Sequence, residues 1–377
     1  MPRRRSSRNR AAASGAVLII VFILAAAALF ERLGFGGRTI EIPTLVGLPT
    51  GGIINLTPQA AATATSGGLY SLYFTEPGQP QGTGPDQPLV AAIDQATQSV
   101  DVAAYSLSLT SLRDALLKAQ QRGVPVRVVM ESDNLDGSVP QTLEDAGIPI
   151  LGDRREGLMH DKFVVIDGAQ VWTGSMNLTT SGAYNDNNNW MQIRSPQVAQ
   201  DYTVEFEEMF TADQFGPAGV ANTPYPQVTL DGAQLEVYFS PDDGVAQHVI
   251  DLIDGATQSI YFLAYSFTSD PIADAMLQRA QAGVMVGGVF EEAQYESNTG
   301  TEYDRLKAAG IDVRLDGNPG QMHHKVIIVD ERAVAFGSYN FSASAEQRND
   351  ENLLIVHDPT IAARFMDEYR KVYGQAQ

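Results

Sequence analysis

The sequence predicts an α/β protein of two related halves, each a mostly parallel sheet flanked by helices, with an active site at their interface. Three observations lead to this prediction. The second half of the chain repeats segments of the first, β-branched segments alternate with amphipathic ones, and each repeat carries one motif of histidine, lysine and aspartate. Alternating strands and helices are typical of a sheet covered by helices.

The chain of 377 residues exceeds the usual size of a single domain, so a duplicated unit is expected. We divide it into a cytoplasmic basic tail with a transmembrane signal anchor (1–38), a flexible linker (39–68), a first half (69–220) and a second half (221–377). The sequence contains no cysteine, which excludes disulfides and thiolate chemistry.

The N-terminal region has the features of a membrane anchor. Five arginines within the first ten residues precede an uncharged apolar run from Ala11 to Phe30. A helix of twenty such residues spans a bilayer, and the arginines are expected to keep their end in the cytoplasm. A cleaved signal peptide is the alternative, since Ala25–Ala28 offers small residues to a peptidase. The body is therefore expected outside the cytoplasm, either anchored or secreted.

Residues 39–68 are rich in Gly, Pro, Thr and Ala, and Glu41 is their only charge after Arg38. They show no sustained periodicity, which is typical of a flexible tether. A short hairpin docked on the body is the alternative.

The repeat covers the whole body. Ile93–Ser99 matches Ile253–Ser259, and the triplet Ala104-Tyr105-Ser106 recurs as Ala264-Tyr265-Ser266. Predicted strands are Val100–Tyr105, Val124–Met130, Ile260–Tyr265 and Val284–Phe290. Predicted amphipathic helices are Ser111–Arg122 and Pro271–Ala282, and each is followed by a glycine suited to a helix C-terminus, Gly123 or Gly283.

The repeated motif consists of His, Lys two places later, Asp five places after that, and then Gly-Ser-x-Asn. The first copy supplies His160, Lys162, Asp167, Ser175 and Asn177, and the second supplies His323, Lys325, Asp330, Ser338 and Asn340. The apolar residues between Lys and Asp predict a buried strand. Residues two apart on a strand share a face, so each copy presents an imidazole beside an ammonium.

This pair of motifs resembles the phospholipase D superfamily, including bacterial phospholipase D-like phosphodiesterases. The resemblance covers residues 69–377 and implies an enzyme that needs no cofactor and no metal. It implies that one imidazole attacks phosphorus and forms a phosphohistidine, while the other protonates the leaving alcohol and then activates water. Lys162 and Lys325 would contact the phosphate oxygens. Ser175, Asn177, Ser338 and Asn340 would bind the phosphate or support the lysines.

Two further residues are expected to orient the histidines. Asn188 stands twenty-eight residues after His160, and Glu351 stands twenty-eight after His323. In the family a carboxylate or amide at this place accepts a hydrogen bond from the ring. We expect Glu351 to keep His323 protonated as the acid and Asn188 to orient His160 as the neutral nucleophile.

Other polar and aromatic residues receive structural interpretations. Asp167 and Asp330, at the far end of the strand, are predicted to be structural. Asp161 and His324 are expected to face away from the site, and Trp172 and Trp190 to lie in the core. The Asn185–Asn189 run is predicted to be a loop, and the Asp242-Asp243 pair to lie on the surface.

Charge and the predicted anchor favour a phospholipid substrate. The net charge is −20, and removal of residues 1–38 leaves 18 basic and 44 acidic residues, a net charge of −26. An acidic body repels polyanions and argues against a nucleic-acid partner. Three alternatives remain: a nuclease of the same superfamily, phosphatidyl transfer as in cardiolipin synthases, and a binding module without activity. The duplication predicts a monomer that forms an intramolecular pseudo-dimer.

Overall fold

A computed structural model describes residues 65–377, and side chains from residue 68 onward. The predicted basic tail, signal anchor and most of the linker lie outside these residues. No helix between residues 65 and 377 is long and apolar enough to cross a membrane. The last residues of the segment predicted as linker form a strand, β1 (Thr65–Gly67), which pairs antiparallel with β2 (Tyr70–Phe74).

The two halves repeat one order of elements. The first half continues with α2 (Asp86–Asp94), β3 (Val100–Ala104), α3 (Thr110–Gln121), β4 (Val126–Met130), α4 (Ser138–Asp145), β5 (Ile150–Gly152), β6 (Lys162–Ile166), β7 (Gln170–Gly174), α5 (Thr180–Tyr184), β8 (Asn189–Ile193) and α6 (Pro196–Phe210). The second half contains β9 (Gln227–Leu230), β10 (Ala233–Ser240), α7 (Val245–Asp254), β11 (Ser259–Ala264), α8 (Asp270–Gln281), β12 (Met285–Phe290), α9 (Glu292–Ser297), α10 (Tyr303–Ala308), β13 (Asp312–Leu315), β14 (Lys325–Val329), β15 (Ala333–Gly337), α11 (Ala343–Gln347), β16 (Glu351–His357) and α12 (Pro359–Gln375).

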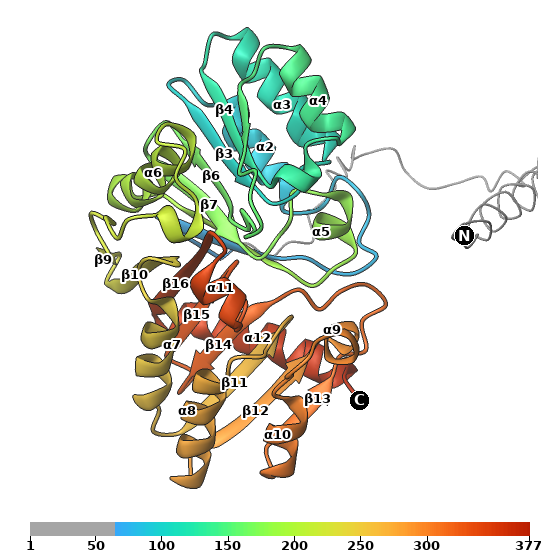
Figure 1. The fold of residues 1–377 in the computed structure, drawn as a ribbon, viewed down its shortest axis with the longest axis vertical. Helices are drawn as coiled ribbons and strands as arrows, with labels where there is room; N and C mark the ends of the chain where they lie inside the picture. The colour runs from blue at the N-terminus through green and yellow to red at the C-terminus, as the bar shows by residue number, and fades with distance from the viewer. Residues whose placement is uncertain (1–64) are drawn as a thin grey trace, which may run out of the picture. The chain divides into compact units, whose positions relative to one another are not determined.

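The sheets confirm the predicted duplication. Each has eight strands, in the orders β1-β2-β8-β7-β6-β3-β4-β5 and β9-β10-β16-β15-β14-β11-β12-β13. Every strand of the first half thus has its counterpart at the same position in the second. Figure 1 shows the first half in blue to green and the second in yellow to red, each with helices packed on its sheet. The predicted α/β class with two helix-flanked halves is correct.

The predicted strand directions are wrong. In each sheet only two neighbouring pairs are parallel, β3 with β4 and β4 with β5, and their counterparts β11 with β12 and β12 with β13. The strand that begins with the motif lysine runs antiparallel to both neighbours, as β6 does between β3 and β7. The alternation of strand and helix holds only for the segment before the motif. After the motif the chain returns directly through β6 and β7, and such short connections give antiparallel pairs.

The predicted amphipathic helices begin and end within one residue of their expected limits. α3 ends at Gln121 and α8 at Gln281, and the glycines that follow two residues later, Gly123 and Gly283, have φ of 85° and 91°. Glycine adopts this left-handed conformation without a Cβ penalty, so it ends both helices. The last helices of the two halves share one kind of N-terminal cap. Ser195 and Asp358 accept hydrogen bonds at the starts of α6 and α12, and a proline follows each.

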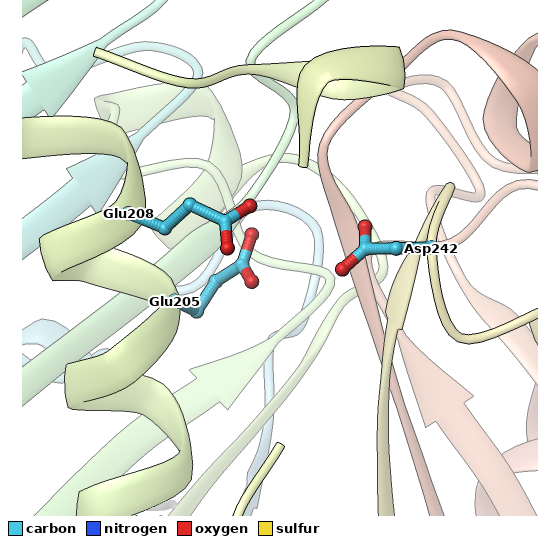
Figure 2. A group of neighbouring side chains, drawn as sticks. All are labelled: Glu205, Glu208 and Asp242. Carbon is cyan, nitrogen blue, oxygen red and sulfur yellow. The ribbon is translucent and has the colours of Figure 1, made fainter. Parts of the chain in front are cut away.

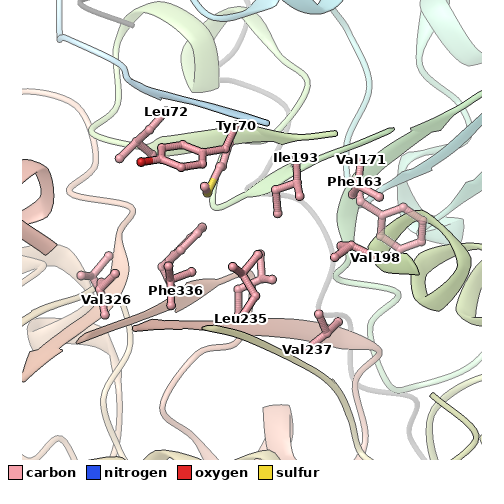
Figure 3. Packing of buried hydrophobic residues seen from close by; sticks show 14 of the residues in the cluster. Tyr70, Leu72, Phe163, Val171, Ile193, Val198, Leu235, Val237, Val326 and Phe336 are labelled. Carbon is pink, nitrogen blue, oxygen red and sulfur yellow. The ribbon is translucent and has the colours of Figure 1, made fainter. Parts of the chain in front are cut away.

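One apolar core joins the halves. It contains residues of both sheets and the inner faces of α6 and α12. Figure 3 shows Tyr70 and Ile193 of the first sheet across from Leu235 and Phe336 of the second. One further core lies beneath the outer helices of each half. The core of the first half includes the fully buried Trp172 and Trp190, as predicted. The shared core holds the two motif strands in one body.

The motif aspartates hold a turn at the far end of the sheet. The Asp167 carboxylate accepts hydrogen bonds from the backbone N–H groups of Thr97, Gln98 and Ser99, at 2.7–3.0 Å. Asp330 receives the same bonds from residues 257–259. Partial burial raises the pKa of Asp167, but these hydrogen bonds outweigh it and lower the pKa below its ordinary value. Both aspartates thus connect the end of the motif strand to the start of β3 or β11.

We expect Asp167→Ala to lower the free energy of unfolding by about 1–2 kcal/mol, because three backbone donors lose their acceptor. Asp167→Asn is the matched control, since it retains an acceptor and tolerates the left-handed φ of 56°. Because the pKa is lowered, the stabilisation is present at pH 7 and is lost as pH falls through the folded-state pKa. Denaturant unfolding of the variants at pH 7 and pH 3.5 measures both effects. An alanine variant as stable as the parent at pH 7 contradicts this role.

Candidate active site

Both motif histidines open into one cavity. This cavity of about 510 Å³ is lined by residues of both halves. The first half contributes His160, Asn177 and Tyr105, and the second contributes their counterparts His323, Asn340 and Tyr265. The two imidazoles therefore face one space, as the duplication predicts.

The two lysines lie beneath the histidines and are fully buried. Lys162 Nζ donates to the carbonyl of His160 at 2.7 Å, and Lys325 Nζ donates to that of His323 at 2.8 Å. Burial lowers the pKa of Lys162 to about 7, and burial together with the charge of Lys162 lowers the pKa of Lys325 well below its usual range. Two buried ammonium groups without a carboxylate hydrogen bond are poised to gain from a bound anion.

The partners of the histidines cross between the halves, contrary to the sequence analysis. His160 Nδ1 lies 2.9 Å from Oε2 of Glu351, and His323 Nδ1 lies 2.9 Å from Oδ1 of Asn188. The expectation that Glu351 supports His323 and Asn188 supports His160 is wrong. Each histidine is oriented by the other half.

Backbone hydrogen bonds between the halves explain the crossing. The N–H of His160 donates to the carbonyl of Asp350, and the N–H of Asp350 donates to Leu158, both at 2.9 Å. This bridge places Glu351 beside the ring of His160. An equivalent bridge joins Asn187 to residues 321 and 323, which places Asn188 beside His323.

The environment of Glu351 fixes its carboxylate beside His160. Glu351 accepts hydrogen bonds from Asn349 Nδ2 at 2.9 Å and from the N–H of Asn340 at 3.1 Å. Burial raises the pKa of Glu351 to about 7, whereas burial and the charges of Lys162 and Lys325 lower the pKa of His160 well below its ordinary value. A bound anion that offsets the lysine charges would favour a positive charge on His160.

Within the described residues 65–377, His323 has only neutral hydrogen-bond partners. Besides Asn188, its Nδ1 lies 3.0 Å from the carbonyl oxygen of Ser175. The Asn188 amide is oriented by donating to the carbonyl of Gly182, so its oxygen faces the ring. Both partners are acceptors, so Nδ1 carries a proton and Nε2 is the nitrogen that exchanges one. Burial and the charge of Lys325 lower the pKa of His323 well below its usual range.

The motif serines lie behind the cavity, whereas the motif asparagines line it. Ser175 Oγ donates to Asn188 Oδ1 at 2.9 Å, and Ser338 Oγ accepts from the N–H of Asn352 at 3.0 Å. Both serines therefore hold the strand that carries the histidine partners. Asn177 and Asn340 line the cavity instead, and their Oδ1 atoms are buried without a hydrogen-bond partner among residues 65–377.

The glycine before each motif serine is required by close strand packing. A Cβ on Gly174 would lie 2.3 Å from the carbonyl oxygen of Asn189, and one on Gly337 would lie 2.2 Å from that of Asn352. Any side chain there would push β7 from β8, or β15 from β16. The Gly-Ser pair thus places each serine directly on the strand that supports a histidine.

Residues behind the motif form a second layer between the halves. Asp161 and His324 are buried and absent from the cavity lining. Asp161 Oδ1 accepts from Asn352 Nδ2 at 2.6 Å, and His324 Nδ1 lies 3.1 Å from Asn189 Nδ2. The prediction of a loop at 185–189 is wrong at its end, because Asn189 begins β8 and Asn187–Asn189 are fully buried.

Tyr105 and Tyr265 are two further site residues, which were not predicted from the sequence. Their rings lie 5.1 Å from His160 and 4.5 Å from His323, and the Lys162 and Lys325 ammonium groups lie over the same rings. The repeated Ala-Tyr-Ser triplet was a visible signal, but it follows a strand distant from the motif in sequence. The residues that line the cavity include no carboxylate.

Comparisons with known proteins match both halves of the chain. A family model described as "Cardiolipin synthase, PLD-like domain" matches residues 89–210 and 249–373, once in each half. A phospholipase D from Rickettsia bellii (strain RML369-C) is 30% identical over 156 residues, which cover 40% of this chain and 77% of that protein. The mitochondrial cardiolipin hydrolase of Homo sapiens is 36% identical over 120 residues, which cover 32% of this chain and 47% of that protein.

Among solved structures, the phosphatidylserine synthase of Haemophilus influenzae Rd KW20 matches with a TM-score of 0.60 and 11% identity. The match covers 77% of this chain and 84% of that one, and it shows a shared fold. The family model matches well over half of this chain and falls on both halves of the duplication. The chain therefore belongs to the phospholipase D superfamily.

Proposed function

We propose that this protein hydrolyses phosphodiester bonds of phospholipids through a phosphohistidine intermediate. The observation that carries the proposal is the cavity shared by His160 and His323, with a buried lysine beneath each imidazole. Two imidazoles supply a nucleophile and an acid, and the two ammonium groups offset the charge of the phosphate.

We assign His160 as the nucleophile. When its Nε2 bonds to phosphorus, the ring acquires a positive charge, and the Glu351 carboxylate at Nδ1 offsets that charge. This assignment agrees with the sequence analysis but replaces its reason, which depended on Asn188. A neutral amide would not stabilise the charged phosphohistidine ring.

His323 is then the acid. Its imidazolium form has no carboxylate to stabilise it, so it gives up the Nε2 proton readily to the departing alcohol oxygen as the P–O bond breaks. A bound phosphodiester, being anionic, favours protonation of His323 before this step. In the second step neutral His323 takes a proton from water, whose oxygen attacks phosphorus and displaces His160.

Several features support a lipid substrate. Curated relatives carry the names phospholipase D and mitochondrial cardiolipin hydrolase. Apart from the two histidines, the cavity lining is uncharged and contains no lysine or arginine track for a polynucleotide. We further propose that the body is a monomer outside the cytoplasm, anchored or released according to the fate of residues 1–38.

Transfer to an alcohol is a second candidate function, favoured by the family model's description as a cardiolipin synthase domain. It uses the same phosphohistidine and differs only in whether water or an alcohol attacks. The outcome depends on which acceptor the cavity admits in the second step.

The full-length protein in detergent micelles should cleave phosphatidylcholine, phosphatidylglycerol or cardiolipin and release phosphatidic acid. His160→Ala should abolish cleavage, whereas His357→Ala, which removes a histidine paired with Glu236 away from the cavity, should not. Added glycerol reveals transfer as a new phosphatidyl ester. Cleavage of single-stranded DNA with no cleavage of any lipid would overturn the lipid assignment.

We expect kcat/KM to peak near pH 7 and to fall on both sides, by about tenfold per pH unit on each limb. Below pH 7 Glu351 gains a proton, because its pKa is raised to about 7, and its negative charge is lost. Above pH 7 Lys162 loses its proton, because its pKa is lowered to about 7. Because these charged groups interact, the apparent pKa of each limb belongs to the set of groups and not to one residue alone. Glu351→Gln should remove the acidic limb, and an unchanged profile in that variant argues against this origin.

A further inference from the structure

Three carboxylates outside the cavity converge where the two halves meet. Glu205 and Glu208 lie one turn apart on α6, the last helix of the first half, and Asp242 follows β10 of the second half. One oxygen from each lies within 4.8 Å of the others. Figure 2 shows the three carboxylates directed toward one another. Asp242, which is predicted to lie on the surface, is partly buried and partly exposed.

Among residues 65–377, Glu205 has no hydrogen-bond or ion-pair partner for its carboxylate. Its side chain belongs to a residue that is 7% exposed, points into the cluster, and accepts no hydrogen bond from any described residue. Across residues 65–377, no lysine, arginine or histidine forms an ion pair with Glu205, Glu208 or Asp242. Glu208 accepts only from the N–H of Val220 and the amide of Asn222. Carboxylates this close together in a largely buried position are neutralised either by protons or by a bound cation.

A backbone carbonyl adds a fourth oxygen to the group. A Cβ on Gly219 would lie 2.8 Å from Oε1 of Glu208, 3.0 Å from Oδ1 of Asp242 and 3.0 Å from the carbonyl oxygen of Gly216. These three oxygens thus surround one small volume, and Gly219 leaves it free of a side chain. Oxygen-only ligands are typical of hard cations.

We propose that Glu205, Glu208 and Asp242 bind one Ca²⁺ ion. Ca²⁺ takes about six to eight oxygen ligands in a flexible geometry, which suits an all-oxygen group whose carboxylates lie within 4.8 Å of one another. Three ionised carboxylates carry three negative charges, and a divalent cation offsets two of them. The site uses no residue of the catalytic cavity.

The ion would connect the halves close to the catalytic glutamate. Ser240, the last residue of β10, pairs in register with Glu351, and Asp242 follows two residues later. Binding at Asp242 therefore fixes the segment beside Glu351 to α6. Ca²⁺ is expected to raise the thermal stability of the body strongly and to change the rate of catalysis only modestly.

Calorimetric titration of CaCl₂ into the EDTA-treated full-length protein at pH 7.5, in detergent micelles, tests the proposal. We expect one Ca²⁺ per chain with a Kd of about 1 mM or tighter, and a Tm several degrees higher in saturating Ca²⁺. Glu205→Gln should weaken binding at least tenfold. Asp213→Asn is the matched control, because it removes an exposed carboxylate shortly after α6 that pairs with Arg154, and it should bind Ca²⁺ as the parent does.

The same titration on His160→Ala separates this proposal from the proposed function, because that inactive variant should still bind Ca²⁺. If Glu205→Gln does not fold, Glu208→Asp keeps the charge, shortens one ligand and should still weaken binding. The absence of Ca²⁺ binding and of any Tm shift in the folded parent protein would overturn the proposal. Equal Ca²⁺ affinity in the parent, Glu205→Gln and Glu208→Asp would also overturn it, since the ion would then bind elsewhere.

Discussion

His323→Ala is expected to accumulate a phosphohistidine on His160 when the substrate carries a good leaving group such as p-nitrophenol. This leaving group departs without an acid, so attack by His160 proceeds, but no base remains to activate water in the second step. One equivalent of p-nitrophenol should be released in a burst. Turnover of an ordinary phospholipid should fall by at least about 10⁴-fold.

His160→Ala is the paired variant for this experiment. It should give neither the burst nor the phosphoenzyme, with a similar loss of lipid turnover. Acid-free quenching, proteolysis and mass spectrometry locate the phosphoryl group. Finding the group on His323 in His160→Ala, with none on His160 in His323→Ala, would reverse the two roles.

Glu351→Gln should lower kcat/KM by about 10²–10⁴-fold, because the ring of His160 loses the negative charge that stabilises its phosphorylated form. Glutamine can still accept a hydrogen bond from Nδ1, so the ring keeps its orientation. The burst rate with a p-nitrophenyl ester should fall by a similar factor, since the carboxylate acts on the first step.

Glu302→Gln is the matched control for this variant. Burial raises the pKa of Glu302 to about 7, as it does for Glu351, but Glu302 pairs with Arg305 and does not line the cavity. Its kcat/KM should remain within about threefold of the parent, as expected for a change that adds no interaction with the site. A loss in Glu302→Gln as large as that in Glu351→Gln would show that any buried carboxylate has the same effect.

Much of the site was predictable because it is repeated. Two copies of one motif identified His160, Lys162, His323 and Lys325, and the alternation of side chains along a strand placed each pair on one face. The duplication also predicted one cavity between two halves, and the eight-stranded sheets with equivalent strand orders agree with it.

The partners of the histidines could not be predicted, for a physical reason. Spacing along the chain suggests that Glu351 belongs with His323, since both lie in one repeat. The backbone bridge between His160 and Asp350 forms only when the halves associate, and it exchanges the partners. Strand direction could not be predicted for a different reason, which lies within each half. The chain returns directly from β6 to β7, and β8 and β16, which insert between β2 or β10 and β7 or β15, were not recognised as strands.

The acidic cluster was equally hidden. Asp242 seemed an ordinary surface residue because its partners, Glu205 and Glu208, lie in the other half of the chain. Neither half alone shows a ligand set with metal-binding spacing. To predict a site that forms when two repeats associate, one must know how the halves pair as well as the sequence pattern within each half.

The most direct test is a structure of the protein with orthovanadate, which adopts the trigonal-bipyramidal geometry of phosphorus under attack. A single vanadium bonded to Nε2 of His160, with Nε2 of His323 on its opposite oxygen and both lysine ammonium groups on the remaining oxygens, is the predicted result. Two separate anions, one at each histidine with no shared oxygen shell, would contradict the account.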